Sequence, residues 1–67
     1  MIDKIGIAAG EIWKKLKNEG EVVITKLQRK TGLPLNLFYL GLGWLARENK
    51  VSFKIEKRTI HVSLKEQ

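Results

Sequence analysis

The sequence predicts an α+β domain that contains three helices, one short strand and a C-terminal β-hairpin. Three observations predict this class. Apolar residues recur at helical spacing near the N-terminus, a Thr-Gly-Leu-Pro turn separates two further helical segments, and the last segment alternates between apolar and polar residues. The chain of 67 residues is a single domain, 1–67, and a domain this small buries only about 60% of its unfolded surface. Its stability margin is therefore thin.

Residues 2–18 predict an amphipathic helix that ends near Gly20. Its apolar face consists of Ile2, Ile5, Ala9, Ile12 and Leu16. Gly6 and Gly10 share a flank of this helix with Trp13, although each glycine costs about 1 kcal/mol relative to alanine in a helix interior. We therefore expect another element, either a partner helix or the hairpin, to approach this flank closely.

The middle of the chain predicts a helix-turn-helix. A short β-like run at 22–24 precedes a helix that continues to residue 31, where Gly32 can act as the C-cap. Thr25 and Gln28 fit the T-x-x-Q capping box, although a helix start one or two residues earlier is equally compatible. The proline of the Thr-Gly-Leu-Pro turn lacks a donor and suits the first turn of the next helix.

The C-terminal segment predicts two antiparallel strands, because apolar and polar residues alternate strictly in it. With Lys57 and Arg58 as a tight turn, the cross-strand pairs are Ile55 with Ile60, Phe53 with Val62, and Val51 with Leu64. Lys-Arg is not favoured in a two-residue turn, and a loop from Glu56 to Thr59 would keep the same register. In both cases the six apolar residues share one face of the sheet.

The third helix carries no charged side chain from Leu33 to Ala46. One side of this helix predicts the core stripe: Phe38, Leu42, Leu45 and Asn49, flanked by Gly41. A second apolar row follows beside it: Leu37, Leu40, Gly41 and Trp44. The second row is either an extra-wide core face or an exposed interaction surface. Tryptophan anchors and a nearby glycine are typical of protein interfaces, so the self-association candidates are Leu37, Leu40, Gly43, Trp44 and Trp13.

Net charge +6 and a pI near 9.9 favour polyanionic partners. The alternative is a merely solvated lysine-rich surface, which also occurs in heat-adapted proteins. The candidate phosphate contacts are Lys26, Arg29 and Lys30 on the second helix, and Lys57 and Arg58 at the hairpin tip. Near the start of the third helix only Asn36 and Tyr39 are suited to reading base edges, and Arg47, about three turns along, suits a phosphate or a carboxylate.

No catalytic constellation is found in the sequence. The match of "GLGWLA" at 41–46 to a dinucleotide fingerprint lacks the preceding strand and the following βαβ unit, and is accidental. His61 is the only histidine, and no second type of ligand clusters near it in the sequence, so we expect no metal, cofactor or small-molecule substrate. The N-terminus does not resemble a signal peptide, and the uncharged stretch is too short to span a bilayer, so we expect a cytoplasmic protein that does not bind membranes.

The stretches "AGEIW" at 9–13, "KLQRKTGL" at 26–33 and "LGWLARENKVSF" at 42–53 resemble a family of small, stand-alone winged helix-turn-helix proteins of bacteria and archaea that is functionally uncharacterised. The resemblance covers nearly the whole chain. It implies that the third helix is the recognition helix and that the hairpin tip is the wing. It implies a fold and no specific activity.

These observations favour a non-enzymatic winged-helix binding module. We expect a homodimer, formed through apolar surface of the third and first helices, that binds nucleic acid only weakly and through backbone charge. One alternative is a sequence-specific DNA-binding transcription regulator with Asn36 and Tyr39 as readers. Another is an adaptor whose apolar helix docks a different protein.

Overall fold

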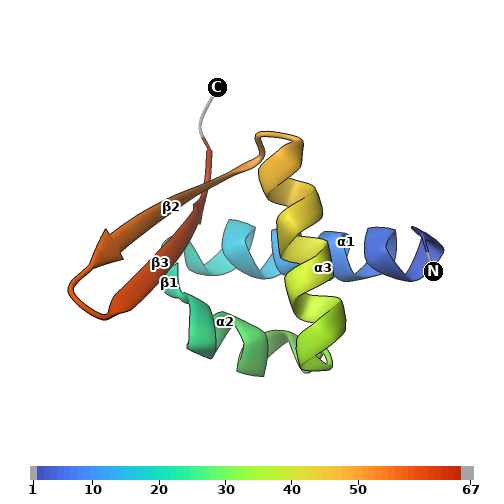
Figure 1. Cartoon of the computed structure of the whole chain (residues 1–67), viewed down its shortest axis with the longest axis horizontal. Coiled ribbons are helices and arrows are strands. Elements are labelled where there is room, and N and C mark those ends of the chain that lie inside the picture. The colour runs from blue at the N-terminus through green and yellow to red at the C-terminus, as the bar shows by residue number, and fades with distance from the viewer. Residues whose placement is uncertain (1, 66–67) are drawn as a thin grey trace.

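The computed structural model describes residues 2–65 and confirms the predicted α+β fold. The elements follow in the order α1 (Ile2–Glu19), β1 (Val22–Val23), α2 (Ile24–Thr31), α3 (Leu35–Arg47), β2 (Val51–Glu56) and β3 (Thr59–Leu64). α3 crosses α1, and the β2–β3 hairpin projects to one side beyond the helices (Figure 1). The helix-turn-helix of α2 and α3 is thus followed by a wing.

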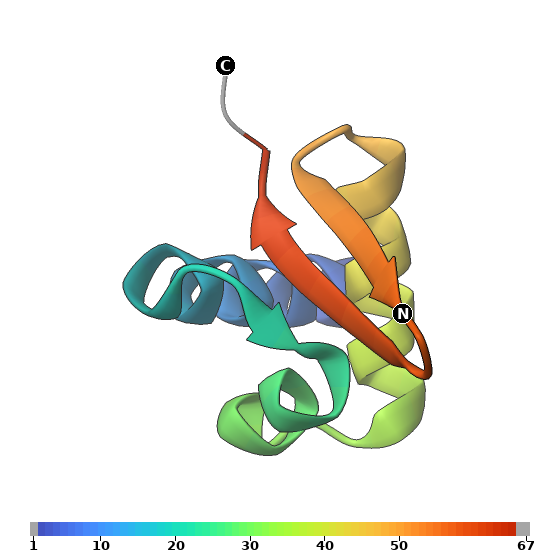
Figure 2. The same cartoon turned by 90° about the vertical axis from the view of Figure 1, so that its left-hand side faces the viewer.

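The three strands form one antiparallel sheet in the order β1-β3-β2. In Figure 2, α1 and α3 lie behind this sheet and α2 lies below it. Every helix and the central strand contribute a fully buried side chain to the core. These side chains are Ile12, Leu16, Leu27, Phe38 and Val62. The predicted apolar face of α1 is confirmed at Ala9, Ile12 and Leu16, while the side chain of Ile2 lies outside the described part of the chain.

α1 and α3 touch most closely at Gly41. A Cβ atom on Gly41 would lie 2.9 Å from the backbone nitrogen of Ala9 and 3.0 Å from the Cβ of Ala8, so only glycine fits there without movement. By contrast, nothing lies within 4 Å of a Cβ built on Gly6 or Gly10. The expectation that the hairpin approaches the Gly6 and Gly10 flank is therefore wrong, because the close contact of α1 is made on its alanine side.

The turn between α2 and α3 depends on Gly32, which has a φ of 70° and donates its N–H to the carbonyls of Gln28 and Arg29 at 3.2 Å each. The alternative of an earlier helix start is confirmed, and the capping box is not formed, because α2 begins at Ile24 and Thr25 already lies within the helix. The Gln28 amide instead donates to the Leu33 carbonyl at 2.7 Å, which ties α2 to the turn. The proline of the turn is the N-cap residue of α3 rather than part of its first turn.

The hairpin has the predicted register, with all three apolar pairs and a two-residue turn at Lys57 and Arg58. However, not all of the apolar side chains on this face of the hairpin are buried in the core. Val51 and Val62 at the base of the wing are 6% and 0% exposed, whereas Phe53 and Ile55 are 46% and 74% exposed. The apolar face of the hairpin therefore continues past the edge of the helical layer.

α3 ends at Arg47, two residues earlier than the predicted core stripe. Asn49 adopts a φ of 61°, the left-handed conformation expected at this junction, and directs the chain into β2. Its assignment to the core stripe is wrong, because a residue beyond the helix end no longer follows the helical period. Asn49 is exposed, and its Oδ1 accepts a hydrogen bond from Lys65 at 2.6 Å.

Candidate functional site

α3 separates two exposed apolar surfaces. Gly41 faces α1, and because residues follow one another at about 100° around a helix, Tyr39 lies about 200° away on the side of the wing. We call the surface toward α1 the tryptophan face; it comprises Trp13, Leu37, Leu40 and Trp44. We call the other the wing face; it comprises Leu35, Tyr39, Phe53, Ile55 and Ile60.

On the tryptophan face, Trp13 of α1 and Trp44 of α3 line one open hollow of about 300 Å³. The two indoles are 37% and 45% exposed, and Leu40, one turn before Trp44, is 45% exposed. Lys17 places its ammonium 4.9 Å from the centre of the Trp13 ring, a cation–π distance. Two residues that are far apart in the sequence are thus brought to the same site.

The remaining self-association candidates are placed differently. Leu37 is half-buried and Gly41 is buried against α1, so part of the second apolar row faces the interior, as the alternative interpretation of that row proposed. Gly43 is exposed, and nothing lies within 4 Å of a Cβ built on it. Between Asn36 and Arg47, the solvent side of α3 therefore presents the apolar side chain of Leu40 and the exposed backbone of Gly43.

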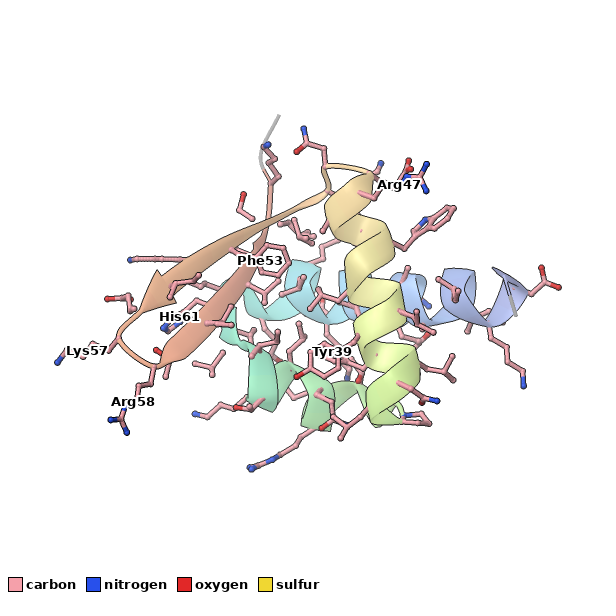
Figure 3. The ribbon with its side chains drawn as sticks, in the orientation of Figure 1. Tyr39, Arg47, Phe53, Lys57, Arg58 and His61 are labelled. Carbon is pink, nitrogen blue, oxygen red and sulfur yellow. The ribbon has the colours of Figure 1, made fainter. Side chains whose placement is uncertain are left out.

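The two candidate base readers lie at the start of α3. Asn36 is exposed, and its Oδ1 accepts a hydrogen bond from the Leu37 N–H at 2.8 Å. Tyr39 is 51% exposed, and its ring packs edge-on against the buried Phe38 ring, with 5.1 Å between the centroids. Arg47 lies at the opposite end of α3 (Figure 3). Between Tyr39 and Arg47 the side chain that can form a hydrogen bond is the Trp44 indole, which lies on the tryptophan face, so the structure does not assemble a row of base readers.

The wing face was not anticipated from the sequence. Phe53, Ile55 and Ile60 project from the side of the hairpin that carries the buried valines, and Phe53 and Tyr39 lie between the hairpin and α3 in Figure 3. The lengths of the predicted strands and helices could have indicated that this face is exposed. Six-residue strands extend about 20 Å, whereas the eight residues of α2 extend about 12 Å, so the helix cannot cover the hairpin to its tip.

The helix-turn-helix carries cations but no carboxylates. No Asp or Glu occurs in residues 22–47, which contain Lys26, Arg29, Lys30 and Arg47. Lys30 forms an ion pair with Glu19 at 3.4 Å, but within the described residues 2–65 no carboxylate lies within 4.0 Å of the other three. The absence of Asp and Glu from residues 22–47 is visible in the sequence, although the overall composition does not show it.

At the wing tip, Lys57 and Arg58 point away from the body of the protein (Figure 3). Neither forms an ion pair with a carboxylate among the residues that the structure describes. Lys57 has a φ of 51° in the turn, and the Thr59 hydroxyl closes the turn by donating to the Glu56 carbonyl at 2.9 Å. The tip therefore holds two solvated cations at a fixed position on the hairpin.

His61 is less isolated than the sequence suggested. On the outer side of β3, its Nδ1 lies 3.4 Å from a Glu21 oxygen and its Nε2 lies 3.7 Å from a Glu56 oxygen. Within residues 2–65 no group of three potential ligand side chains is arranged to hold a metal ion. In the same range no helix is long and apolar enough to cross a membrane.

Comparison with known proteins places these features in a family context. A family model described as "Winged helix-turn-helix domain (DUF2582)" matches residues 1–64. An uncharacterised protein of Methanocaldococcus jannaschii is 40% identical over 53 residues, which are 76% of each chain. The solution NMR structure of a Bacteroides thetaiotaomicron protein superposes with a TM-score of 0.82 at 34% identity, and the match covers 92% of this chain and 76% of the other.

Proposed function

We propose that this chain, which belongs to the winged helix-turn-helix domain family DUF2582, is a non-enzymatic binding module that pairs with a second copy of itself through the tryptophan face. In this proposal the module contacts nucleic acid through phosphates rather than through base edges. The fold explains the arrangement of the elements. The chemistry of the exposed side chains supports the choice of partner.

The observation that carries the proposal is the exposure of Leu40 and Trp44 on an uncharged helix, beside Trp13. Tryptophan in a shallow apolar hollow is the side chain that most often anchors a protein interface. Burial of these groups stabilises an assembly by about 25 cal/mol for each Å² of apolar surface removed from water. A domain of 67 residues, with its small core, gains more from such burial than a larger one does.

The charges around the hollow favour a second copy as the partner. Glu48 and Lys50, which carry opposite charges, both line the hollow. A two-fold symmetric dimer places the same patch on both partners, so a patch that carries a single sign of charge repels its own copy. A patch with both signs can instead place an anion of one copy near a cation of the other.

The nucleic-acid part of the proposal rests on four cations that form no ion pair within residues 2–65: Lys26, Arg29, Lys57 and Arg58. Phosphate contacts of this kind position a protein on a nucleic acid without reading its sequence. Because the solvent side of α3 presents Leu40 and Gly43 where base readers would be needed, we expect binding that is steep in salt and tolerant of sequence.

Leu40→Glu tests the pairing. It places two like charges near the symmetry axis, so we expect a dimeric parent protein and a monomeric variant in sedimentation velocity at micromolar concentrations. The matched control is Ser52→Glu, the same charge change at an exposed position on the outer face of β2, which should stay dimeric. Circular dichroism of both variants checks that they are folded.

Other outcomes would identify the alternatives. A folded parent protein that is monomeric, or a Leu40→Glu variant that stays dimeric, would contradict pairing through the tryptophan face and would favour an adaptor that docks a different protein. Selection of DNA sequences that yielded one tight, salt-tolerant motif would contradict binding that tolerates any sequence. Asn36 and Tyr39 would then be the first residues to substitute.

A further inference from the structure

We propose that the wing face binds single-stranded nucleic acid, with bases stacked on Tyr39 and Phe53 and phosphates held by cations of the wing tip and α2. This inference deepens the nucleic-acid part of the proposed function. It is independent of pairing through the tryptophan face, which lies on the other side of α3.

The two aromatic rings are exposed but held in place. Tyr39 is 51% exposed and Phe53 is 46% exposed, and both lie in the space between the hairpin and α3 (Figure 3). Tyr39 is packed edge-on against Phe38, which is fully buried. Phe53 is the cross-strand partner of Val62, which is also fully buried. Each ring is therefore attached to the core and needs little ordering before a base stacks on it.

Along the wing, apolar side chains are followed by cationic side chains, an order that suits the binding of a nucleotide chain. Phe53 lies nearer the base of the hairpin, the cross-strand pair Ile55 and Ile60 follows, and Lys57 and Arg58 form the tip. Ile55, at 74%, is far more exposed than a side chain meant for the core of this domain would be. Apolar surface for bases and sugars thus lies directly beside cations for phosphates.

The charge around the wing face favours a polyanion over an apolar protein partner. The helix-turn-helix that borders this face contains no carboxylate. Its Arg29 has no carboxylate within 4.0 Å in the described residues, whereas Lys26 lines a hollow together with Glu19, Glu21 and His61. Glu56, the acid nearest the tip, is in contact with Lys54 at 3.6 Å and lies on the outer face of the hairpin. The tryptophan face differs, because its hollow is lined by an anion, Glu48, as well as a cation, Lys50.

The exposed rings favour a single strand over a duplex. In a duplex the faces of the bases are covered by their neighbours, and a protein reads their edges with hydrogen bonds. The solvent side of α3 offers few such groups. A single strand exposes the faces of its bases, and stacking on aromatic side chains tolerates any sequence because every base has such a face.

The experiment compares a fluorescently labelled oligothymidylate with a duplex of equal length by anisotropy at low salt. We expect the parent protein to bind the single strand more tightly. Tyr39→Ala and Phe53→Ala should each weaken this binding by about 5- to 100-fold, the range that loss of one stacking ring produces. Tyr39→Phe and Phe53→Tyr keep the rings and should keep the affinity. Ile7→Ala is the matched control, because Ile7 is an exposed apolar side chain of α1, at 66%, that belongs to neither face.

A direct measurement complements the affinities. Tyr39 is the only tyrosine in the sequence, so its ring protons can be followed by NMR without ambiguity. Stacking of a base on this ring shifts these signals upfield as oligothymidylate is added. The Leu40→Glu variant should show the same shift, which separates this inference from the outcome of the pairing experiment.

Three results would overturn the inference. One is a duplex that binds as tightly as the single strand. Another is alanine variants that stay folded and keep the parent affinity within a factor of about two, which is too small for the loss of a stacking ring. The third is no measurable binding of oligothymidylate at low salt, which would leave the wing face as a docking surface for a protein.

Discussion

The two sides of α3 expose aromatic side chains to nearly the same degree and differ in almost every other respect. Trp44 on the tryptophan face is 45% exposed, and Phe53 on the wing face is 46% exposed. Glu48 and Lys50 line the hollow beside Trp44, whereas Lys57 and Arg58, which pair with no carboxylate in the described residues, lie beyond Phe53 at the wing tip. Exposure of an apolar group shows that a surface is available. The neighbouring charges indicate which partner it suits.

The two faces also differ in how firmly they are supported. The tryptophan face lies on two helices that touch at Gly41, where even a methyl group would collide with α1. The wing face lies on a hairpin that is anchored by Val51 and Val62 and is free of the helical layer toward its tip. A substitution can therefore disturb one face and leave the other intact. Substitutions at the helix crossing and at the base of the wing test whether the two faces differ in this way.

The largest expected effect comes from the anchor of the wing. Val51→Asp buries a carboxylate beneath the sheet and should lower the free energy of unfolding by about 3 kcal/mol or more. Ile55→Asp makes a similar change on the same face of the same strand, at a position that is 74% exposed, and should cost less than about 1 kcal/mol. Chemical denaturation of both variants measures the difference. Equal losses would show that the tip of the wing is packed as firmly as its base.

A smaller effect is expected at the helix crossing. Gly41→Ala forces α1 and α3 apart and should destabilise the fold by about 1–3 kcal/mol. Gly43→Ala, two residues along the same helix, adds a methyl group in open space and should stabilise the helix by up to about 1 kcal/mol. The sign of the change in melting temperature is the readout. A neutral Gly41→Ala variant would contradict a rigid contact between α1 and α3.

The smallest effect concerns affinity alone. Reversing Lys57 and Arg58 to Glu should weaken binding to every nucleic acid together and reduce the slope of log affinity against log salt by about 2, because two phosphate contacts are lost. The same reversal at Lys4 and Lys14 on α1 changes the net charge equally and should change the slope little. Salt titrations of both double variants test this. Equal slopes in the two variants would indicate that the overall charge, not the wing tip, determines binding.

Much of the fold could be predicted from the sequence because it depends on local chemistry. Alternation in the C-terminal segment determined the pairing of Ile55 with Ile60 and of Val51 with Leu64, and Gly32 marked the end of α2. The alternation of apolar and polar residues predicts which side chains share a face of the sheet. It does not predict how far the helices extend beneath that face. For this reason the sequence did not predict that Phe53 and Ile55 are exposed.

The candidate site was predicted only in part, because it depends on where two helices cross. The sequence pointed to Gly6 and Gly10 as places of close approach, whereas the contact forms at Gly41. Residue spacing within each helix contains no information about the crossing point. The same limit applies to the hollow between Trp13 and Trp44, whose residues were both named as candidates but could not be placed beside each other before the fold was known.

The turn at the wing tip shows a conflict between stability and charge. Lys57 has a φ of 51°, a conformation that costs roughly 1–2 kcal/mol for a residue with a side chain and that Gly or Asn adopts more easily. A hairpin optimised for stability alone would place one of those residues there. This chain instead carries a cation at its most strained turn position, in a domain with little stability to spare. Such a trade-off is typical of positions whose side chain serves an interaction rather than the fold.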